Sequence, residues 1–228
     1  GSIIASHIRI PGGGPVPDMV HFHSVGFQLI YCYKGWVDLV YEDQGPAFRL
    51  EAGNCVIQPP EIRHRVLFAS EDLEVIEIGV PAEHITTIDH SMDLPTEHIC
   101  PDRLFEGQRF VHYKANETEW RPFRLPGFVA RDTMICANTG AVAGVQVVKP
   151  GSGRPVWASH TSDIHFTFVL HGQLTLQSKE QTAQRLLAGD AFVIPPDMAC
   201  LYGAPSEDLE LLEVSLPGEF DTHLEDGA

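Results

Sequence analysis

Residues 20–36 read VHFHSVGFQLIYCYKGW and combine two histidines with a run of strand-forming residues. His21 and His23 are separated by one residue, and Gln28 and Gly35 follow at longer intervals. Successive side chains of a β-strand point to opposite faces, so the two imidazoles share a face if this segment is extended. Two histidines on one face of an apolar strand indicate either a binding site or hydrogen-bonded polar residues inside a core.

The chain contains an internal repeat. SEDLEVIEIGVPAE begins at Ser70 and SEDLELLEVSLPGE at Ser206, an offset of 206 − 70 = 136 residues with eight identities in fourteen positions. FRLEAGNCVIQPPEIRH (48–64) aligns with QRLLAGDAFVIPPDMAC (184–200) at the same offset. Both copies are rich in β-branched and aromatic residues, alternate as strands do and are separated by turn residues. The sequence therefore predicts two tandem copies of one all-β domain, each a sandwich or barrel.

Two short motifs in the first copy resemble those of the cupin superfamily. His21, His23, Gln28 and Gly35 have the spacing of the first cupin motif, HxH, four residues, Glu or a substitute, six residues and Gly. Gly53, Pro59 and His64 match the second motif, in which Glu61 stands where a second Gly is usual. The resemblance implies a bicupin, two tandem double-stranded β-helix (jelly-roll) barrels with a short connector. We place the first barrel at residues 1–95, and the connector with the second barrel at 96–228.

The resemblance also implies that His21, His23 and His64 converge on one divalent transition metal ion. Imidazole suits Zn, Cu, Fe and Ni, and the expected ion is Fe, Ni, Mn or Zn. Gln28 stands where many cupins have a carboxylate; it either adds an amide oxygen to the metal or hydrogen-bonds a bound water or substrate. Three neutral imidazoles leave the ion its full charge, which favours anionic ligands.

Strand alternation predicts the lining of this pocket. If Gln28 faces inward, so do Ile30 and Cys32, and an inward His64 brings Val66 and Phe68 inside with it. Cys32 is expected to be a core thiol. No residue is assigned as a general base, although Glu61 lies beside the second motif.

The repeat alignment gives the second barrel an incomplete motif. His23 corresponds to His160, Gln28 to His165 and His64 to Cys200, whereas His21 corresponds to Ala158. A His, His and Cys set could hold a soft metal with a vacant position, so these three residues form a candidate second site. The alternative is a barrel kept for structure, with Cys200 as a small buried residue.

The amino-acid composition argues against several classes of binding partner. Acidic residues outnumber basic ones by 31 to 15, a formal charge of −16, which argues against nucleic acid and anionic membranes. No run approaches the roughly 20 apolar residues of a membrane span, and no signal peptide is visible. The five cysteines form no CxxC pair, which favours a reduced, cytoplasmic setting. Exposed β-edges and the outward Tyr31 and Tyr33 favour a homodimer.

The cupin superfamily includes several functional classes, so the fold alone does not identify the reaction. The residues of the site must indicate it instead. Three-histidine sites without a carboxylate resemble those of dioxygenases that cleave aromatic rings or β-diketones. We therefore expect a metal-dependent, dioxygenase-like enzyme acting on a small aromatic, enolic or diketone substrate, anionic or apolar in character. The alternatives are a non-enzymatic, metal-dependent metabolite-binding protein and a cupin isomerase or lyase.

Overall fold

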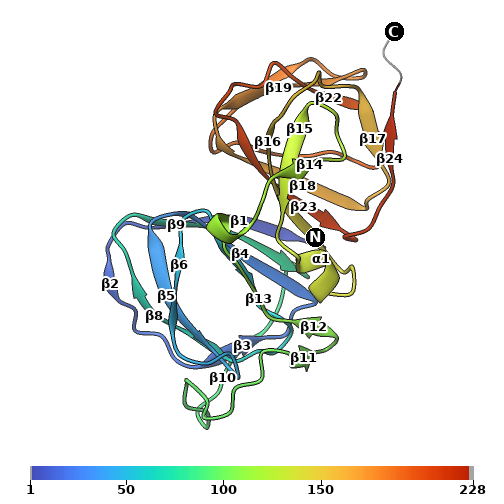
Figure 1. The fold of residues 1–228 in the computed structure, drawn as a ribbon. Coiled ribbons are helices and arrows are strands. Elements are labelled where there is room, and N and C mark those ends of the chain that lie inside the picture. Colours follow the sequence, from blue (N-terminus) through green and yellow to red (C-terminus); the bar gives the residue numbers. More distant parts are fainter. Residues whose placement is uncertain (1, 226–228) are drawn as a thin grey trace. The chain divides into compact units, whose positions relative to one another are not determined.

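The computed structural model describes residues 2–225, which form two compact units. The first unit reaches Ala115 and also includes Asn138–Gly140, and the second comprises Asn116–Ala137 and continues from Ala141. Each unit consists of antiparallel strands in two sheets that curl into a barrel (Figure 1). The predicted fold of two tandem all-β barrels is confirmed.

The first barrel is built from a five-stranded and a six-stranded sheet. The five-stranded sheet has the order β1 (Ile4–Ile10), β9 (Leu73–Val80), β4 (Phe27–Lys34), β7 (Cys55–Ile57) and β13 (Val111–Tyr113). The other sheet has the order β10 (Thr86–Ile88), β3 (His21–His23), β8 (His64–Ala69), β5 (Trp36–Tyr41) and β6 (Phe48–Glu51), with β2 (Gly14–Pro15) paired to β8. A separate hairpin joins β11 (Leu104–Phe105) to β12 (Gln108–Arg109).

The first unit is longer than the predicted 1–95. Strand β13 pairs with β7, so that Val111 lies opposite Ile57 and Tyr113 opposite Cys55. Val111 and Tyr113 are buried, so this segment completes the first barrel. The division between the units therefore follows Ala115, later than the predicted division after residue 95.

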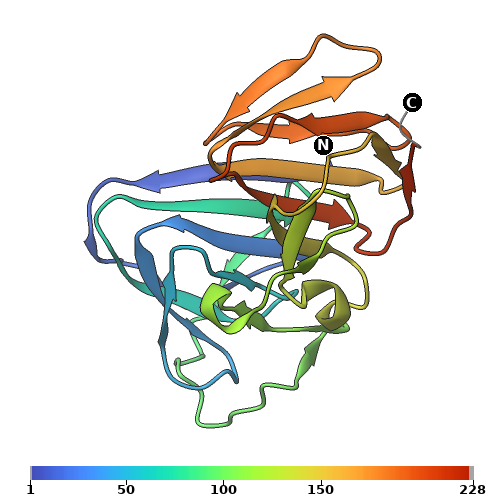
Figure 2. The same cartoon turned by 45° about the horizontal axis from the view of Figure 1, so that its top comes forward.

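The second barrel repeats this plan, with a six-stranded and a five-stranded sheet. One sheet has the order β14 (Arg121–Pro122), β15 (Phe128–Asp132), β16 (Gly144–Pro150), β23 (Glu210–Leu216), β18 (Ile164–His171) and β21 (Ala191–Val193). The other has the order β20 (Gln184–Leu187), β19 (Gln173–Ser178), β22 (Cys200–Gly203), β17 (Ala158–His160) and β24 (Thr222–Leu224), with the β19–β20 hairpin in orange in Figure 2. The helices are η1 (Ala115–Glu117) and α1 (Ile135–Asn138). Among the described residues, no helix has the length and apolar character to cross a bilayer.

The duplication is visible in a turn that both barrels share. Gly35 and Gly172 connect equivalent strands with φ of 71° and 69°, in the left-handed region that favours glycine. After each glycine, the next backbone N–H donates to a serine hydroxyl, Ser70 Oγ in the first barrel and Ser206 Oγ in the second, both at 2.9 Å. A Cβ on either glycine would meet that same hydroxyl. The first motif therefore needs its glycine for both conformation and close packing.

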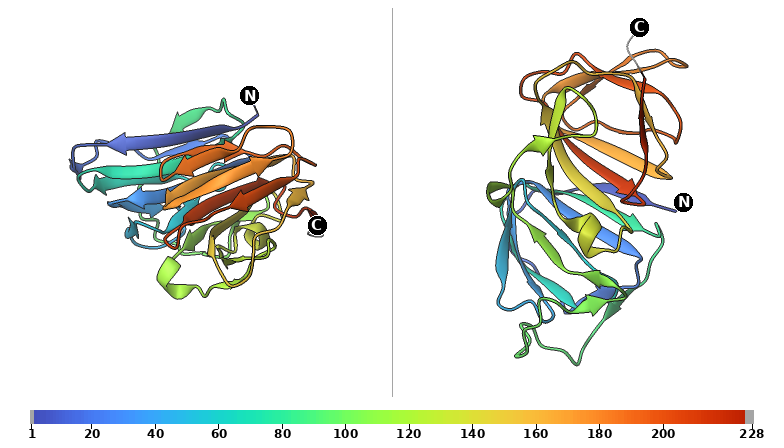
Figure 3. Two further views of the ribbon diagram at one scale, coloured as in Figure 1. Left: turned by 90° about the horizontal axis from the view of Figure 1, so that it is seen from above. Right: turned by 45° about the vertical axis from the view of Figure 1, so that its right-hand side comes forward.

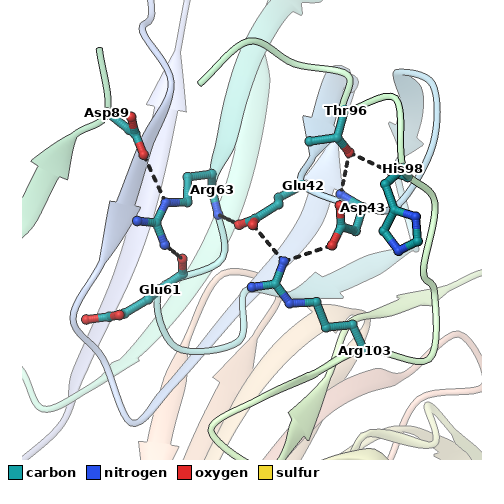
Figure 4. Close-up of polar contacts among 8 residues, drawn as sticks. All are labelled: Glu42, Asp43, Glu61, Arg63, Asp89, Thr96, His98 and Arg103. Atoms are coloured by element: carbon teal, nitrogen blue, oxygen red, sulfur yellow. Dashed lines mark hydrogen bonds and ion pairs between the residues drawn. The ribbon is translucent and has the colours of Figure 1, made fainter. Parts of the chain in front are cut away.

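The segment after β10 runs along one end of the first barrel and is held there by two arginines (Figures 3 and 4). Arg63 Nε donates to Asp89 Oδ2 at 3.1 Å. Arg103 Nη1 donates to Glu42 Oε1 at 2.7 Å and to Asp43 Oδ2 at 2.8 Å. The two carboxylate side chains are only 7% and 10% exposed, so their charges depend on Arg103.

We predict that Arg103→Met destabilises the first barrel. Removing one partner leaves two nearly buried carboxylates without their cation, which should cost about 2 kcal/mol in the free energy of unfolding. The measurement is urea denaturation at pH 7. Arg109→Met is the matched control, because Arg109 Nη1 lies 3.4 Å from Oδ1 of Asp102, whose side chain is 84% exposed. An equal loss of stability in both variants would contradict the prediction.

Candidate metal centre

Three histidines meet inside the first barrel. The register of β3 and β8 places His21 directly opposite His64, and His23 lies two residues further along β3 on the same face. One ring nitrogen from each lies within 4.8 Å of the others. The ring centroids are 4.3 Å apart for His21 and His64 and 5.1 Å for each of the other two pairs. The structure therefore assembles the predicted triad.

Hydrogen bonds fix which nitrogen of each ring is available. Nδ1 of His21 and Nδ1 of His64 each contact the carbonyl oxygen two residues earlier, at 2.8 and 3.0 Å. A carbonyl oxygen only accepts, so both Nδ1 atoms donate, and in the neutral form of each ring the lone pair lies on Nε2. His23 Nδ1 is 2.9 Å from Thr86 Oγ1. Such oxygen partners on the non-ligating nitrogen orient histidine ligands in metal sites, so the donor set fits a divalent ion.

The protonation of the rings agrees with this arrangement. Burial and the neighbouring His21 lower the pKa of His64 to about 3. Burial, His21 and His84 lower the pKa of His23 to about 4. Both rings are therefore neutral at pH 7, the state in which imidazole binds a metal.

Gln28 has its amide nitrogen fixed and its amide oxygen free. Nε2 donates to Glu77 Oε1 at 2.6 Å, whereas Oε1 is buried and has no hydrogen-bond partner among the described residues. Gln28 lies opposite Gly79 on β9, and Glu77 lies opposite Ile30, so both polar side chains share the inward face. A carboxylate accepts only, so Glu77 orients the amide and leaves its buried oxygen as an acceptor without a partner.

Glu77 and His84 are two residues of this site that the sequence analysis did not select. The His84 ring is 5.3 Å from that of His23, and its Cε1 would be 3.5 Å from a Cβ on Gly79. A signal for Glu77 was present, because Glu77 and Glu213 occupy the same position of the repeated strand and alternation turns both inward. Nothing in the spacing of His84 sets it apart from surface histidines.

Three of the four predicted pocket residues are at least partly buried in the first barrel. Cys32 is fully buried, and Ile30 and Val66 pack against the same apolar cluster. Burial raises the pKa of the Cys32 thiol to about 12, as expected of a core thiol. Phe68 differs: it is 38% exposed and stacks on Trp36 with ring centroids 5.8 Å apart.

A β-bulge explains the position of Phe68. Val66 and Phe68 pair with Leu39 and Asp38, two adjacent residues of β5, so one residue of β8 is unpaired. The bulge interrupts the alternation on which the prediction rested, and Ala69 takes the buried position instead.

Glu61 occupies a strained turn position. Its φ is 61°, and its backbone N–H donates to the His23 carbonyl oxygen at 3.1 Å. Asp197, its counterpart in the second barrel, has φ of 64° and bonds His160 in the same way at 2.8 Å. The left-handed conformation explains why glycine is usual in the motif. The exposed Glu61 side chain is assigned no catalytic role.

The second barrel brings together His160 and His165 but not the predicted three-ligand set. Their buried rings stack at 4.4 Å, whereas Cys200 packs within the apolar core cluster. Within residues 2–225, the triad of the first barrel is the one group of three ligand side chains close enough for a metal. Arg124 Nη2 donates to His165 Nε2 at 2.8 Å and to Glu213 Oε2 at 2.9 Å. A guanidinium, which the repeat alignment could not reveal, thus engages the lone pair that a metal would need.

Comparison with known proteins agrees with this architecture. A family model described as the cupin domain matches residues 144–215, within the second barrel. A search of curated proteins found no match. The salicylate 1,2-dioxygenase of Pseudaminobacter salicylatoxidans has a similar structure, with a TM-score of 0.73 and 15% identity over 98% of this chain and 75% of that one.

Other solved structures share the same fold. The oxalate decarboxylase of Lactobacillus farciminis, in its formate complex, has a TM-score of 0.68 and 13% identity over 98% of this chain and 79% of that one. A variant of the salicylate dioxygenase in complex with gentisate has a TM-score of 0.72 and 16% identity, over 99% of this chain and 74% of that one. At these identities, the likeness establishes a shared fold.

We predict that His64→Ala loses most of the bound metal. His64 is the most buried member of the triad, and its removal leaves two ligands. Elemental analysis of protein purified without an affinity tag should find about one equivalent of metal in the wild type. The exposed His223→Ala variant should keep this content, and full metal occupancy in His64→Ala would contradict the assignment.

We predict that the free energy of unfolding of the Arg124→Met variant falls as pH rises. Burial raises the pKa of Glu213, but the Arg124 guanidinium outweighs burial and holds this pKa well below the unfolded value of 4.5. The carboxylate therefore stabilises the wild type above pH 4.5, and this contribution is lost as pH falls below that value. Without Arg124, burial dominates and the pKa rises above the unfolded value, which reverses the sign. Urea denaturation should show Arg124→Met losing stability between pH 5 and pH 8, by about 3 kcal/mol relative to wild type at the upper end. Arg124→Met/Glu213→Gln should recover most of that loss; no recovery would contradict the account.

Proposed function

We propose that this member of the cupin superfamily is a metal-dependent, dioxygenase-like enzyme acting on a small aromatic, enolic or diketone substrate. The observation that carries the proposal is the triad of His21, His23 and His64, together with a neutral amide where a fourth, anionic ligand would otherwise stand. Two of the three rings are held by Nδ1, so the lone pair of the neutral ring lies on Nε2, and none of the four side chains brings a negative charge.

Such a donor set determines the charge that a substrate meets. When bound, a divalent ion such as Fe(II) supplies Lewis acidity and positions for two adjacent substrate oxygens. Neutral ligands do not cancel the charge of the ion, so the site favours substrates that bind as enolates, phenolates or carboxylates. The protein itself contributes rigid ligand geometry and the apolar side chains of Ile30 and Val66.

Gln28 is the residue that we assign to substrate orientation. Its buried Oε1 has no partner, and Glu77 prevents the amide from turning its nitrogen to the same place. A substrate hydroxyl or enol can donate to this oxygen, whereas a bare carboxylate cannot. His84 lies beside His23 and contributes a polar edge to the same site.

The structural neighbours suggest which compounds to test. One similar structure is a salicylate 1,2-dioxygenase variant with gentisate bound, and others are oxalate decarboxylases. Gentisate, salicylate, catechol and acetylacetone sample phenolic and diketone chelators, and oxalate samples a dicarboxylate without a hydroxyl donor.

We predict oxygen consumption by the Fe(II)-loaded protein with at least one of the phenolic or diketone compounds. An oxygen electrode should show turnover in the wild type and none in His64→Ala. Gln28→Ala should keep its metal but turn over about tenfold more slowly, the effect expected from losing one oriented hydrogen bond. Metal-loaded protein that binds these compounds without consuming oxygen would support a non-enzymatic binding role and contradict the proposal.

A further inference from the structure

The second barrel encloses a small cavity at the position that corresponds to the histidine triad of the first. In the first barrel, His21 lies opposite His64. In the second, the aligned residues Ala158 and Cys200 lie opposite each other, so two imidazoles are replaced by small side chains. The space that they leave is a cavity lined only by residues of the second unit.

Three side chains at this cavity have nitrogen atoms without partners. His160 is only 3% exposed, and His165 is fully buried. Neither ring nitrogen of His160 has a hydrogen-bond partner among the described residues, and the same holds for Nδ1 of His165 and Nε of Arg124. All three residues line the cavity. Several buried, unpartnered nitrogens around one enclosed space indicate a group that is supplied from outside.

Most of these nitrogens are donors. Arg124 Nη2 donates to His165 Nε2 at 2.8 Å, so the proton of the neutral His165 ring lies on Nδ1. The guanidinium Nε always carries a hydrogen, and a neutral imidazole carries one, so Arg124 and His160 each add an N–H group. The cavity therefore offers at least three N–H donors, whereas one water molecule accepts two hydrogen bonds. An acceptor without protons of its own satisfies this set better than water.

The charges around His160 also favour an anion. Burial is the largest of the effects that lower the pKa of His160 to about 4, followed by His165 and Arg124. The opposing effects of Glu213 and of the Ile194 backbone are smaller. Repulsion from Arg124 thus exceeds attraction to Glu213 at this ring, although the two side chains form an ion pair at 2.9 Å. The same balance attracts a negative charge placed beside His160.

The size of the cavity restricts the anion. The space open to the centre of a water-sized group is about 10 Å³, close to the room that one water molecule needs. A carboxylate, sulfate or phosphate group is too large for this space, and a single halide ion is nearest to it in size. A metal ion is disfavoured, because the guanidinium of Arg124 lines the same cavity.

We propose that this cavity is a binding site for one chloride-sized monovalent anion. The anion accepts hydrogen bonds from Arg124 Nε, from His165 Nδ1 and from one ring nitrogen of His160. The second barrel thus holds an ion of opposite sign where the first barrel has its histidine triad. The site is independent of the metal centre and of the reaction proposed for the first barrel.

The first test is anomalous diffraction at the bromine absorption edge, from crystals of the full chain soaked in sodium bromide. We expect a bromide peak inside the second barrel, within hydrogen-bonding distance of His160 and Arg124. A water molecule alone in this cavity, a metal ion there or an empty cavity would overturn the proposal.

The second test measures binding in solution, through the broadening of the chlorine NMR line of sodium chloride by the full chain. Bromide should compete and remove the excess linewidth. His160→Phe keeps a ring of similar size without its nitrogens, and Cys200→Val adds bulk to the wall without removing an N–H group. Each variant should lower the excess linewidth about fivefold or more. Circular dichroism checks that both are folded, and if one is not, the other decides.

Two controls locate the chloride. Arg154→Met removes an exposed guanidinium of the same barrel and should keep the wild-type linewidth. His64→Ala should keep it as well, because the first barrel takes no part. The proposal is overturned if the wild type does not broaden the line, so that binding occurs at crystal concentration only. It is also overturned if the folded cavity variants match the wild type, or if either control abolishes the broadening.

Discussion

The strand pairing that sets His21 opposite His64 is the constraint on which the chemistry of the first barrel depends. A slip of one residue would turn His21 and His23 to the other face and separate them from His64. Backbone carbonyls two residues before His21 and His64 then hold each ring by Nδ1. Backbone register, not side-chain flexibility, thus decides where the three lone pairs meet.

The two barrels show how one scaffold can hold different charges in the same place. Glu77 and Glu213 are equivalent inward carboxylates. Glu77 contacts Gln28, and Glu213 contacts His165, the residue that the repeat aligns with Gln28. In the first barrel, the carboxylate orients a neutral amide beside three histidines. In the second, Arg124 supplies a permanent cation to Glu213. That guanidinium comes from the segment between β14 and β15.

Motif spacing and the internal repeat predicted the fold, the triad and the inward position of Gln28, because these depend on strand alternation and short-range register. Phe68 escaped prediction because a bulge in β8 breaks that alternation. Arg124 escaped it because its partner Glu213 lies 89 residues away in the chain. The length of the first unit depended similarly on the distant pairing of β13 with β7.

The most direct test of the central claim is anomalous diffraction from crystals of the metal-loaded protein, recorded at the absorption edge of the bound metal. We expect one strong anomalous peak within coordinating distance of the Nε2 atoms of His21, His23 and His64, and none beside His165, where Arg124 lies. A peak in the second barrel, or no peak at the triad after loading with Fe, Mn, Ni or Zn, would contradict the account.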